Sequence, residues 1–253
     1  MSGSSYYVPH ETKWPFLATI ALMITFIGLA NYMNDESTLT LTLTGLGLLL
    51  IVIYGWFSYV VRESEGGLYD DQVDMSFRWG MAWFIFSEVM FFAAFFGALY
   101  YARELSLPWL AGDGSGVSTN QELWPSFENV WPSNGPANFG GDFVVMKAAG
   151  IPALNTIILL ISGLTVTWAH HGLKEGKRNQ LILGLIATVL LGFIFVGFQA
   201  YEYSHAYNDL NLKMSSGIYG STFYMLTGFH GFHVTLGAIM LTVISVSYTH
   251  LTL

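Results

Sequence analysis

Cysteine is absent from this 253-residue chain, and charged residues make up only 10% of it. The lack of cysteine excludes disulfide bonds, thiolate metal ligands and a cysteine nucleophile. A soluble domain usually carries about 25% charged residues, so this little charge together with 53% hydrophobic residues predicts an integral membrane protein. The net charge of -8 and the lack of a basic cluster argue against nucleic acid as a partner.

Several catalytic signatures are also missing. The chain contains no GxxxxGK[ST] phosphate loop, no HExxH metal motif and no GxSxG nucleophile motif. No apolar segment carries a row of ionisable groups of the kind that pumps and proton relays use. The first residues lack the basic segment and cleavage site of a secretory signal, so the first span is expected to be retained. These absences favour a partner of a catalytic complex that itself binds no soluble substrate.

Six apolar segments are long enough to cross a bilayer, which takes about 20 residues at 1.5 Å per residue. They predict an all-α fold, a polytopic membrane helical bundle forming one domain over residues 1–253. The expected transmembrane helices cover residues 15–33, 39–61, 77–101, 145–169, 181–203 and 219–246. The connection 103–145 is too polar and too rich in proline to cross a membrane.

The distribution of lysine and arginine predicts the orientation. Six of these residues fall on the side of the N-terminus and three on the other side. Basic residues are retained on the cytoplasmic side of a membrane, so the N-terminus is expected in the cytoplasm and the 103–145 connection in the periplasm.

Glu88 is the carboxylate deepest within an expected span. A charge near the middle of a membrane costs about 2.5–3.5 kcal/mol on insertion scales, so such residues face the interior of a bundle and are functional by default. Glu88 is therefore expected to be a protonatable site that bears on proton traffic or on a contact between helices. The alternative is a neutral side chain that only holds the bundle together by a hydrogen bond.

Four further polar residues lie on the fifth and sixth spans and form a possible interhelical network. Gln199 and Glu202 are three residues apart and share a helix face, with Glu202 expected at the water interface. His230 and His233 are also three apart, and imidazole suits iron, copper and zinc. The other histidines near a span are His170 and His171, and they do not obviously converge with His230 and His233. Hydrogen bonding of His230 and His233 to Glu88, Glu202 or the backbone is therefore favoured over metal or haem ligation.

A third group of residues lies at the cytoplasmic interface. Arg62 and Glu63 end the second span, Arg78 begins the third, and Trp56 is an interface anchor. Basic residues at this depth bind lipid phosphate or simply extend their charged heads to water. The residues are compatible with both alternatives, lipid binding and extension of the charged groups into water.

Four sequence blocks together resemble one family. FRWGMAWFIFSEVMFF, VRES, GFQAYEY and YGSTFYMLTGFHGFHVTLG are similar to cytochrome c oxidase subunit III, over six spans in the order of that family. YVPHETKWPF and the long periplasmic connection look like the proteobacterial version. The resemblance implies a subunit without haem or copper, with haem a and copper held by the partner subunits I and II. It also implies a V-shaped arrangement in which the first two helices stand apart and phospholipids fill the cleft.

The resemblance also implies residue roles. Glu88 matches a buried, carbodiimide-reactive glutamate, and Arg62 and Glu63 match positions beside bound lipid. The implied function is to stabilise subunit I, to sustain proton uptake and to slow turnover-linked inactivation of an aerobic respiratory oxidase in the bacterial inner membrane.

The end of the chain departs from the family, which continues with a seventh helix. Residues 247–253 are expected to be an unrelated tail after a truncation, and His250 is given no role. Third subunits of quinol or nitric oxide reductase systems remain alternatives, although they generally lack the first two helices. A membrane electron carrier that binds haem through the four histidines, and a transporter built on Glu88, are the other hypotheses.

Overall fold

The computed structural model describes residues 12–34, 38–138 and 140–250, with side chains described as far as Tyr248. Every long element in these ranges is a helix, and six helices are long and apolar enough to span a membrane. The predicted all-α fold class is therefore confirmed. The chain divides into two compact units, residues 1–88 and 89–253, and the V-shaped arrangement stays a prediction.

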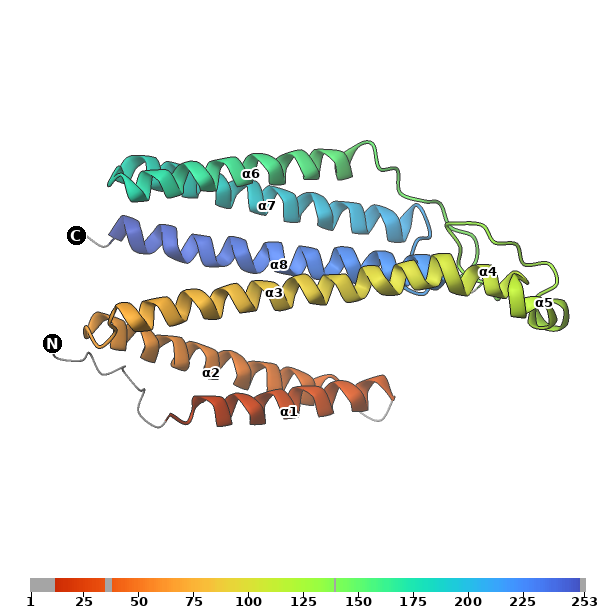
Figure 1. Ribbon diagram of the computed structural model, residues 1–253, viewed down its shortest axis with the longest axis horizontal. Coiled ribbons are helices and arrows are strands. Elements are labelled where there is room, and N and C mark those ends of the chain that lie inside the picture. The colour runs from red at the N-terminus through yellow and green to blue at the C-terminus, as the bar shows by residue number, and fades with distance from the viewer. Residues whose placement is uncertain (1–11, 35–37, 139, 251–253) are drawn as a thin grey trace. The chain divides into compact units, whose positions relative to one another are not determined.

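The first unit contains a helical hairpin. Helix α1 (Trp14–Met33) and helix α2 (Thr40–Glu65) pack against each other along their length (Figure 1). Their backbones approach closely at Gly45, where an added Cβ would lie 2.5 Å from the backbone nitrogen of Thr25. Small residues at such a crossing are how membrane helices pack without a hydrophobic driving force.

Helix α3 (Asp71–Tyr101) begins six residues earlier than the expected span 77–101. The carboxylate of Asp70 accepts a hydrogen bond from the Val73 backbone nitrogen at 2.9 Å and so caps the helix, which explains the early start. At its other end α3 continues through a π-helical turn (Ala102–Ser106) into α4 (Leu107–Leu110). The third span is therefore longer at both ends than the hydrophobic pattern predicted.

The connection that follows is folded against the ends of two later helices, α7 (Arg178–Asn208) and α8 (Gly217–His250). It includes a 3-10 turn (Gly114–Gly116) and helix α5 (Val117–Leu123), and none of its elements is long enough to span a membrane. The Val144 nitrogen donates to the Leu210 carbonyl at 2.9 Å, and the Asn211 side chain donates to the carbonyls of Gly140 and Asp142. These bonds fix the approach of the chain to the next span.

Three helices form the bundle of the second unit: α6 (Ile151–Lys174), α7 (Arg178–Asn208) and α8 (Gly217–His250). Helix α7 packs against both α6 and α8. Helix α6 begins six residues later than the expected Val145, because Gly150 has a positive φ of 132° and precedes Pro152, a residue suited to a first helical turn. Helix α7 is longer than the expected 181–203, and α8 is longer than the expected 219–246.

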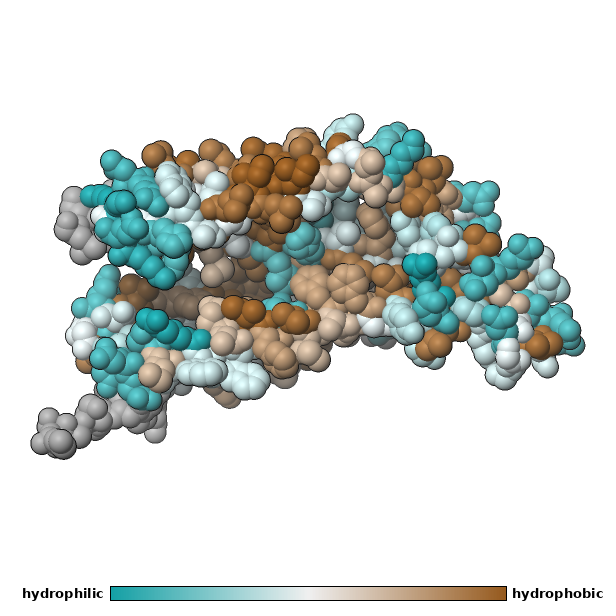
Figure 2. Space-filling model, turned by 45° about the horizontal axis from the view of Figure 1, so that its top comes forward, coloured by the Kyte–Doolittle hydropathy of each residue, from teal (hydrophilic) through white to brown (hydrophobic). Residues whose placement is uncertain are grey.

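The surface of α6 agrees with a membrane location. Hydrophobic residues cover the middle of α6, and hydrophilic residues gather near its two ends (Figure 2). Ile157, Leu160, Ile161 and Leu164 are all exposed on this helix. Side chains of this kind are stable when exposed to lipid.

Candidate functional site

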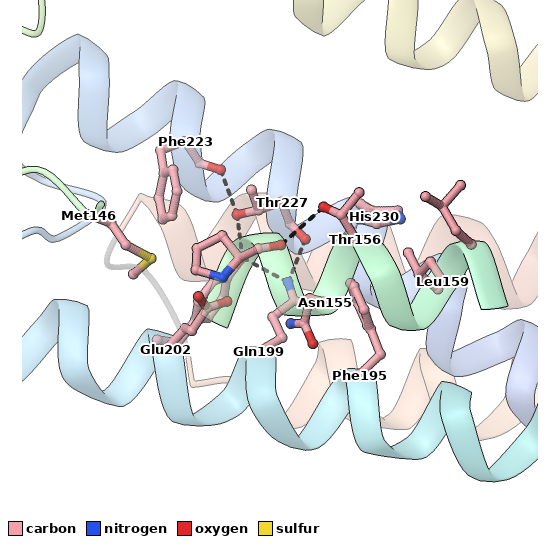
Figure 3. Close-up of a pocket in the computed structure, with 13 residues that line it drawn as sticks. Met146, Asn155, Thr156, Leu159, Phe195, Gln199, Glu202, Phe223, Thr227 and His230 are labelled. Atoms are coloured by element: carbon pink, nitrogen blue, oxygen red, sulfur yellow. Dashed lines mark hydrogen bonds between the residues drawn. The ribbon is translucent and has the colours of Figure 1, made fainter. Parts of the chain in front are cut away.

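A chain of hydrogen bonds joins α7 to α8 inside the second unit (Figure 3). The Gln199 side-chain nitrogen donates to the Thr227 carbonyl at 2.7 Å and to the Tyr203 hydroxyl at 3.3 Å. The hydroxyls of Tyr203 and Thr227 are 2.7 Å apart. Because the Thr227 hydroxyl donates its one proton to the Phe223 carbonyl at 2.7 Å, Tyr203 must be the donor to Thr227.

The hydrogen-bonded chain borders a cavity of about 500 Å³ between α6, α7 and α8. Most of the wall is apolar, and the polar side chains enter from all three helices. The lining residues are Met146, Pro152, Asn155, Thr156, Leu159, Leu160, Phe195, Gln199, Glu202, Tyr203, Phe223, Thr227 and His230. A largely apolar cavity with a few convergent polar groups is the usual form of a binding site.

Three oxygens of this lining are buried without a hydrogen-bond partner among the described residues. They are Oδ1 of Asn155, Oε1 of Gln199 and Oε1 of Glu202. An unpartnered buried acceptor costs about 1–3 kcal/mol, so three of them in one cavity form an unusual concentration of unsatisfied polar groups. Asn155 is itself only 4% exposed.

The tight fit of the carboxamide of Gln199 depends on Gly231. A Cβ added at position 231 would lie 2.4 Å from Oε1 and 2.6 Å from Nε2 of Gln199. The amide cannot be reversed without placing its oxygen against the Thr227 carbonyl, which is also an acceptor. The geometry therefore fixes which atom of Gln199 contacts α8.

The predicted grouping of Gln199 with Glu202 is seen, since both line this cavity from α7. Glu202 does not lie at the end of the helix as expected, because α7 continues six residues further to Asn208. Oε1 of Glu202 is buried, and the residue borders the cavity. Sequence reasoning missed Asn155, Tyr203 and Thr227, although an asparagine inside an apolar span was a signal that could have pointed to the first of them.

The two histidines of α8 occupy different surroundings. His230 lines the cavity and packs edge-on against Phe195, with ring centroids 5.4 Å apart. His233 lies among phenylalanines of α3, 5.3 Å from the Phe92 ring centroid, and its Nδ1 is 2.6 Å from the Phe229 carbonyl. His233 thus has a hydrogen bond to the backbone, one of the partners that the sequence favoured.

The histidines of α6 lie far from His230. His230 shares the cavity with Thr156 in the second turn of α6, whereas His170 is fourteen residues further along, or about 21 Å at 1.5 Å per residue. Within the described ranges, no group of three or more histidine, cysteine or acidic side chains is placed to hold a metal ion. The four histidines therefore do not converge on one site.

The residues expected near lipid all lie in the first unit. Glu63 is buried and accepts a hydrogen bond of 2.7 Å from the Tyr69 hydroxyl, which ties the end of α2 to the loop after it. Arg78 forms an exposed ion pair of 2.8 Å with Asp74, one turn earlier. Arg62 is exposed in the last turn of α2. Their proposed contacts with lipid stay predictions.

Two other expected sites lie on these helices. Trp56 is half-buried on α2, nine residues before the end of that helix at Glu65. Glu88 is half-buried near the middle of α3, at the end of the first unit. The helix is long enough to span a membrane, and the depth of Glu88 in the membrane and its role both stay predictions.

These features define a polytopic helical membrane protein in which polar side chains join the helices of one bundle. A sequence model of the family described as cytochrome c oxidase subunit III matches residues 4–113 and 122–253. The chain therefore belongs to the cytochrome c oxidase subunit III family. The matched range reaches residue 253 and so includes residues 247–253, which gives no support to the expected unrelated tail; residues 251–253 lie outside the described structure.

Relatives in several organisms are named cytochrome c oxidase subunit 3. The cytochrome c oxidase subunit 3 of Carassius auratus is 38% identical over 240 residues, covering 94% of this chain and 81% of the relative. That of Marchantia polymorpha is 38% identical over 242 residues, covering 94% and 80%. That of Prototheca wickerhamii is 40% identical over 254 residues, covering 96% and 83%.

Proposed function

We propose that the chain is the third core subunit of an aerobic respiratory cytochrome c oxidase and that it supports the catalytic subunits without carrying a redox centre. Haem a and copper belong, in this proposal, to the partner subunits I and II, with subunit I as the main contact. The observation that carries the proposal is the family match over nearly the whole chain. The names of the relatives favour the cytochrome c enzyme over a quinol or nitric oxide reductase system.

The surface of α3 supports contact with a partner or with lipid. In the second unit, Phe91 and Phe92 pack against residues of α8. Phe96, Tyr100 and Tyr101 of the same helix are 59–64% exposed, so the other helices of their unit leave them uncovered. A large aromatic surface of this kind, on a helix long enough to span the membrane, suits a neighbouring membrane subunit.

The proposed location is the bacterial inner membrane, with the N-terminus in the cytoplasm. The loop between α6 and α7 supports this orientation, because Lys174, Lys177 and Arg178 lie at that end of the bundle. The same orientation places Arg62 and Arg78 at the cytoplasmic surface. There they would hold phospholipid phosphates together with Glu63 and Trp56.

We assign Glu88 the role of a protonatable group that helps to sustain proton uptake by subunit I. Its position near the middle of a span supports this assignment, because ionisable side chains inside membrane-spanning segments are rare and usually functional. Glu88→Gln in the assembled oxidase should lower oxygen consumption while leaving the haem content of the complex unchanged.

The control for this experiment is Glu122→Gln, which changes an exposed carboxylate on α5 in the same way. Normal turnover of the Glu88→Gln oxidase would show that a neutral hydrogen-bonding side chain is sufficient at position 88. In that case the role of Glu88 would be structural support.

A further inference from the structure

Residues 114–121 lie outside the two ranges that match the family model. They form a 3-10 turn and most of helix α5. The Asn120 side-chain nitrogen donates to the Leu110 carbonyl at 3.0 Å, and the Trp109 indole nitrogen donates to the Ser115 hydroxyl at 3.1 Å. Because these bonds hold the segment against α4, it is a folded addition to the family pattern.

The neighbouring helix α4 carries an uncovered apolar surface. A cavity of about 610 Å³ opens where α3 continues into α4, and it is lined by Tyr101, Leu105, Ser106, Trp109 and Leu110. Leu105 is 51% exposed and Trp109 is 41% exposed, and Val117 at the start of α5 is 45% exposed. Exposed apolar side chains that gather around a hollow mark a contact with another molecule.

This surface lies beyond the membrane-spanning part of the third span. The helical segment Asp71–Leu110 has 40 residues, about twice the roughly 20 that a bilayer requires, so its last turns extend past the apolar core of the membrane. Figure 1 shows α4 and α5 past the ends of α6 and α8. A partner that covers this surface therefore approaches it from outside the membrane.

The charge around this surface is negative. Residues 103–145 contain five aspartates or glutamates, one arginine and no lysine, which gives a net charge of -4. The arginine, Arg103, lies 3.2 Å from Glu104 and offsets one of these charges. Asp113 and Glu128, before and after α5, are exposed, and neither forms an ion pair within the described ranges. Exposed charges of one sign attract and orient a partner of the opposite charge.

We propose that this surface docks the electron donor of the oxidase, a c-type cytochrome with a lysine-rich face. The docking surface consists of Leu105, Trp109, Asp113, Val117 and Glu128. The carboxylates pair with ammonium groups of the donor, and the apolar side chains cover the centre of the contact. The proposal rests on the proposed function, because it takes the connection 103–145 to face the periplasm in an assembled oxidase. It goes beyond that function by giving the third subunit a part in donor binding, while electrons enter through the partner subunits.

The test measures the steady-state kinetics of the assembled oxidase with a reduced, lysine-rich cytochrome c. Asp113→Asn combined with Glu128→Gln should raise the KM for this cytochrome about fivefold at low ionic strength and leave kcat unchanged, because exposed charges act on association. The difference in KM should shrink as salt is added, and it should be absent for the same cytochrome with acetylated lysines.

The matched control combines Glu65→Gln with Asp71→Asn. It removes two exposed carboxylates at the end of α2 and the start of α3, which the proposed orientation places on the other side of the membrane, so the KM should stay unchanged. Leu105→Ser tests the apolar part of the surface. It should raise the KM several-fold at every salt concentration, because burial of an apolar side chain is not screened by ions.

The haem a content of each preparation separates the possible failures. An unchanged KM in the Asp113→Asn, Glu128→Gln oxidase with normal haem a content would overturn the docking proposal and leave the proposed function standing. If a neighbouring subunit covers the surface instead, Leu105→Ser should lower the haem a content and leave the KM unchanged, which would also refute donor docking. A preparation without haem a would contradict the proposed function and, with it, this proposal.

Discussion

Gln199 holds α7 to α8, and its replacement by methionine should measure how much this bond contributes. Methionine keeps the length and unbranched shape of the side chain and removes both N–H donors. Hydrogen bonds between membrane helices contribute about 0.6 kcal/mol on average and up to about 1.7 kcal/mol. Since the bond to the Thr227 carbonyl is short, at 2.7 Å, we expect Gln199→Met to lower the free energy of unfolding by about 1 kcal/mol.

The assay is reversible unfolding of the full chain in mixed micelles, carried out as a double-mutant cycle with Tyr203→Phe. The Tyr203 hydroxyl accepts from Gln199 and donates to Thr227, so the two substitutions break one connected chain. The double variant should lose about 0.5 kcal/mol less than the sum of the single losses, because groups in one hydrogen-bond network are not additive. Gln72→Leu, at an exposed position in the first turn of α3, is the control.

Gly231→Ala provides an independent check of the same geometry. Its added methyl group would overlap the carboxamide of Gln199 and push it away from the Thr227 carbonyl. The loss in free energy of unfolding should largely disappear when Gly231→Ala is combined with Gln199→Ala, which removes the overlapping group. Strict additivity in both cycles, or a Gln199→Met variant as stable as the Gln72→Leu control, would refute this account of the α7–α8 contact.

Three further predictions concern other parts of the chain. Gly45→Leu places a side chain where even an added Cβ would lie 2.5 Å from the backbone of α1. The free energy of unfolding, measured by thermal unfolding in detergent, should fall by about 2 kcal/mol. An unchanged unfolding midpoint would contradict the close crossing of α1 and α2. Tyr69→Phe removes the hydroxyl that donates to Glu63 and should lower the unfolding free energy by about 1 kcal/mol, whereas equal stability would show that the bond is unimportant. The Lys177 ammonium, 2.6 Å from Glu175, lowers the pKa of the Glu175 carboxyl group, so their ion pair is lost as the pH falls through the pKa of Glu175 in the folded state. Lys177→Met should therefore raise the pKa of Glu175 in an NMR titration. A pKa that does not change in this variant would exclude Lys177 as the cause.

Hydrophobic runs were sufficient to predict the number and type of the long helices, because a span must be apolar and must satisfy its own backbone. They were less informative about helix ends, which depend on local polar contacts. The Asp70 cap moved the start of α3 before its apolar run, and the positive φ of Gly150 delayed the start of α6. Each of these signals comes from one or two residues, so the long apolar segment beside it dominates the prediction of where the helix begins.

The candidate site, too, could be predicted only in part from the sequence. Helical spacing correctly placed Gln199 and Glu202 on one face, since a separation of three residues is a property of any helix. It could not identify Asn155 or Thr227, because the register between α6, α7 and α8 is set by packing in three dimensions. For the same reason it grouped His233 with Glu202, whereas the structure places His233 beside phenylalanines of α3.

The most direct test of the oxidase assignment is purification of the tagged chain in a mild detergent, once co-expressed with oxidase subunits I and II and once expressed alone. A reduced-minus-oxidised visible spectrum is then recorded for each preparation. The assignment predicts a haem a signal in the co-expressed sample and none in the chain alone. Haem on the chain alone would instead support an electron carrier, and no haem in either sample would contradict membership of an assembled oxidase.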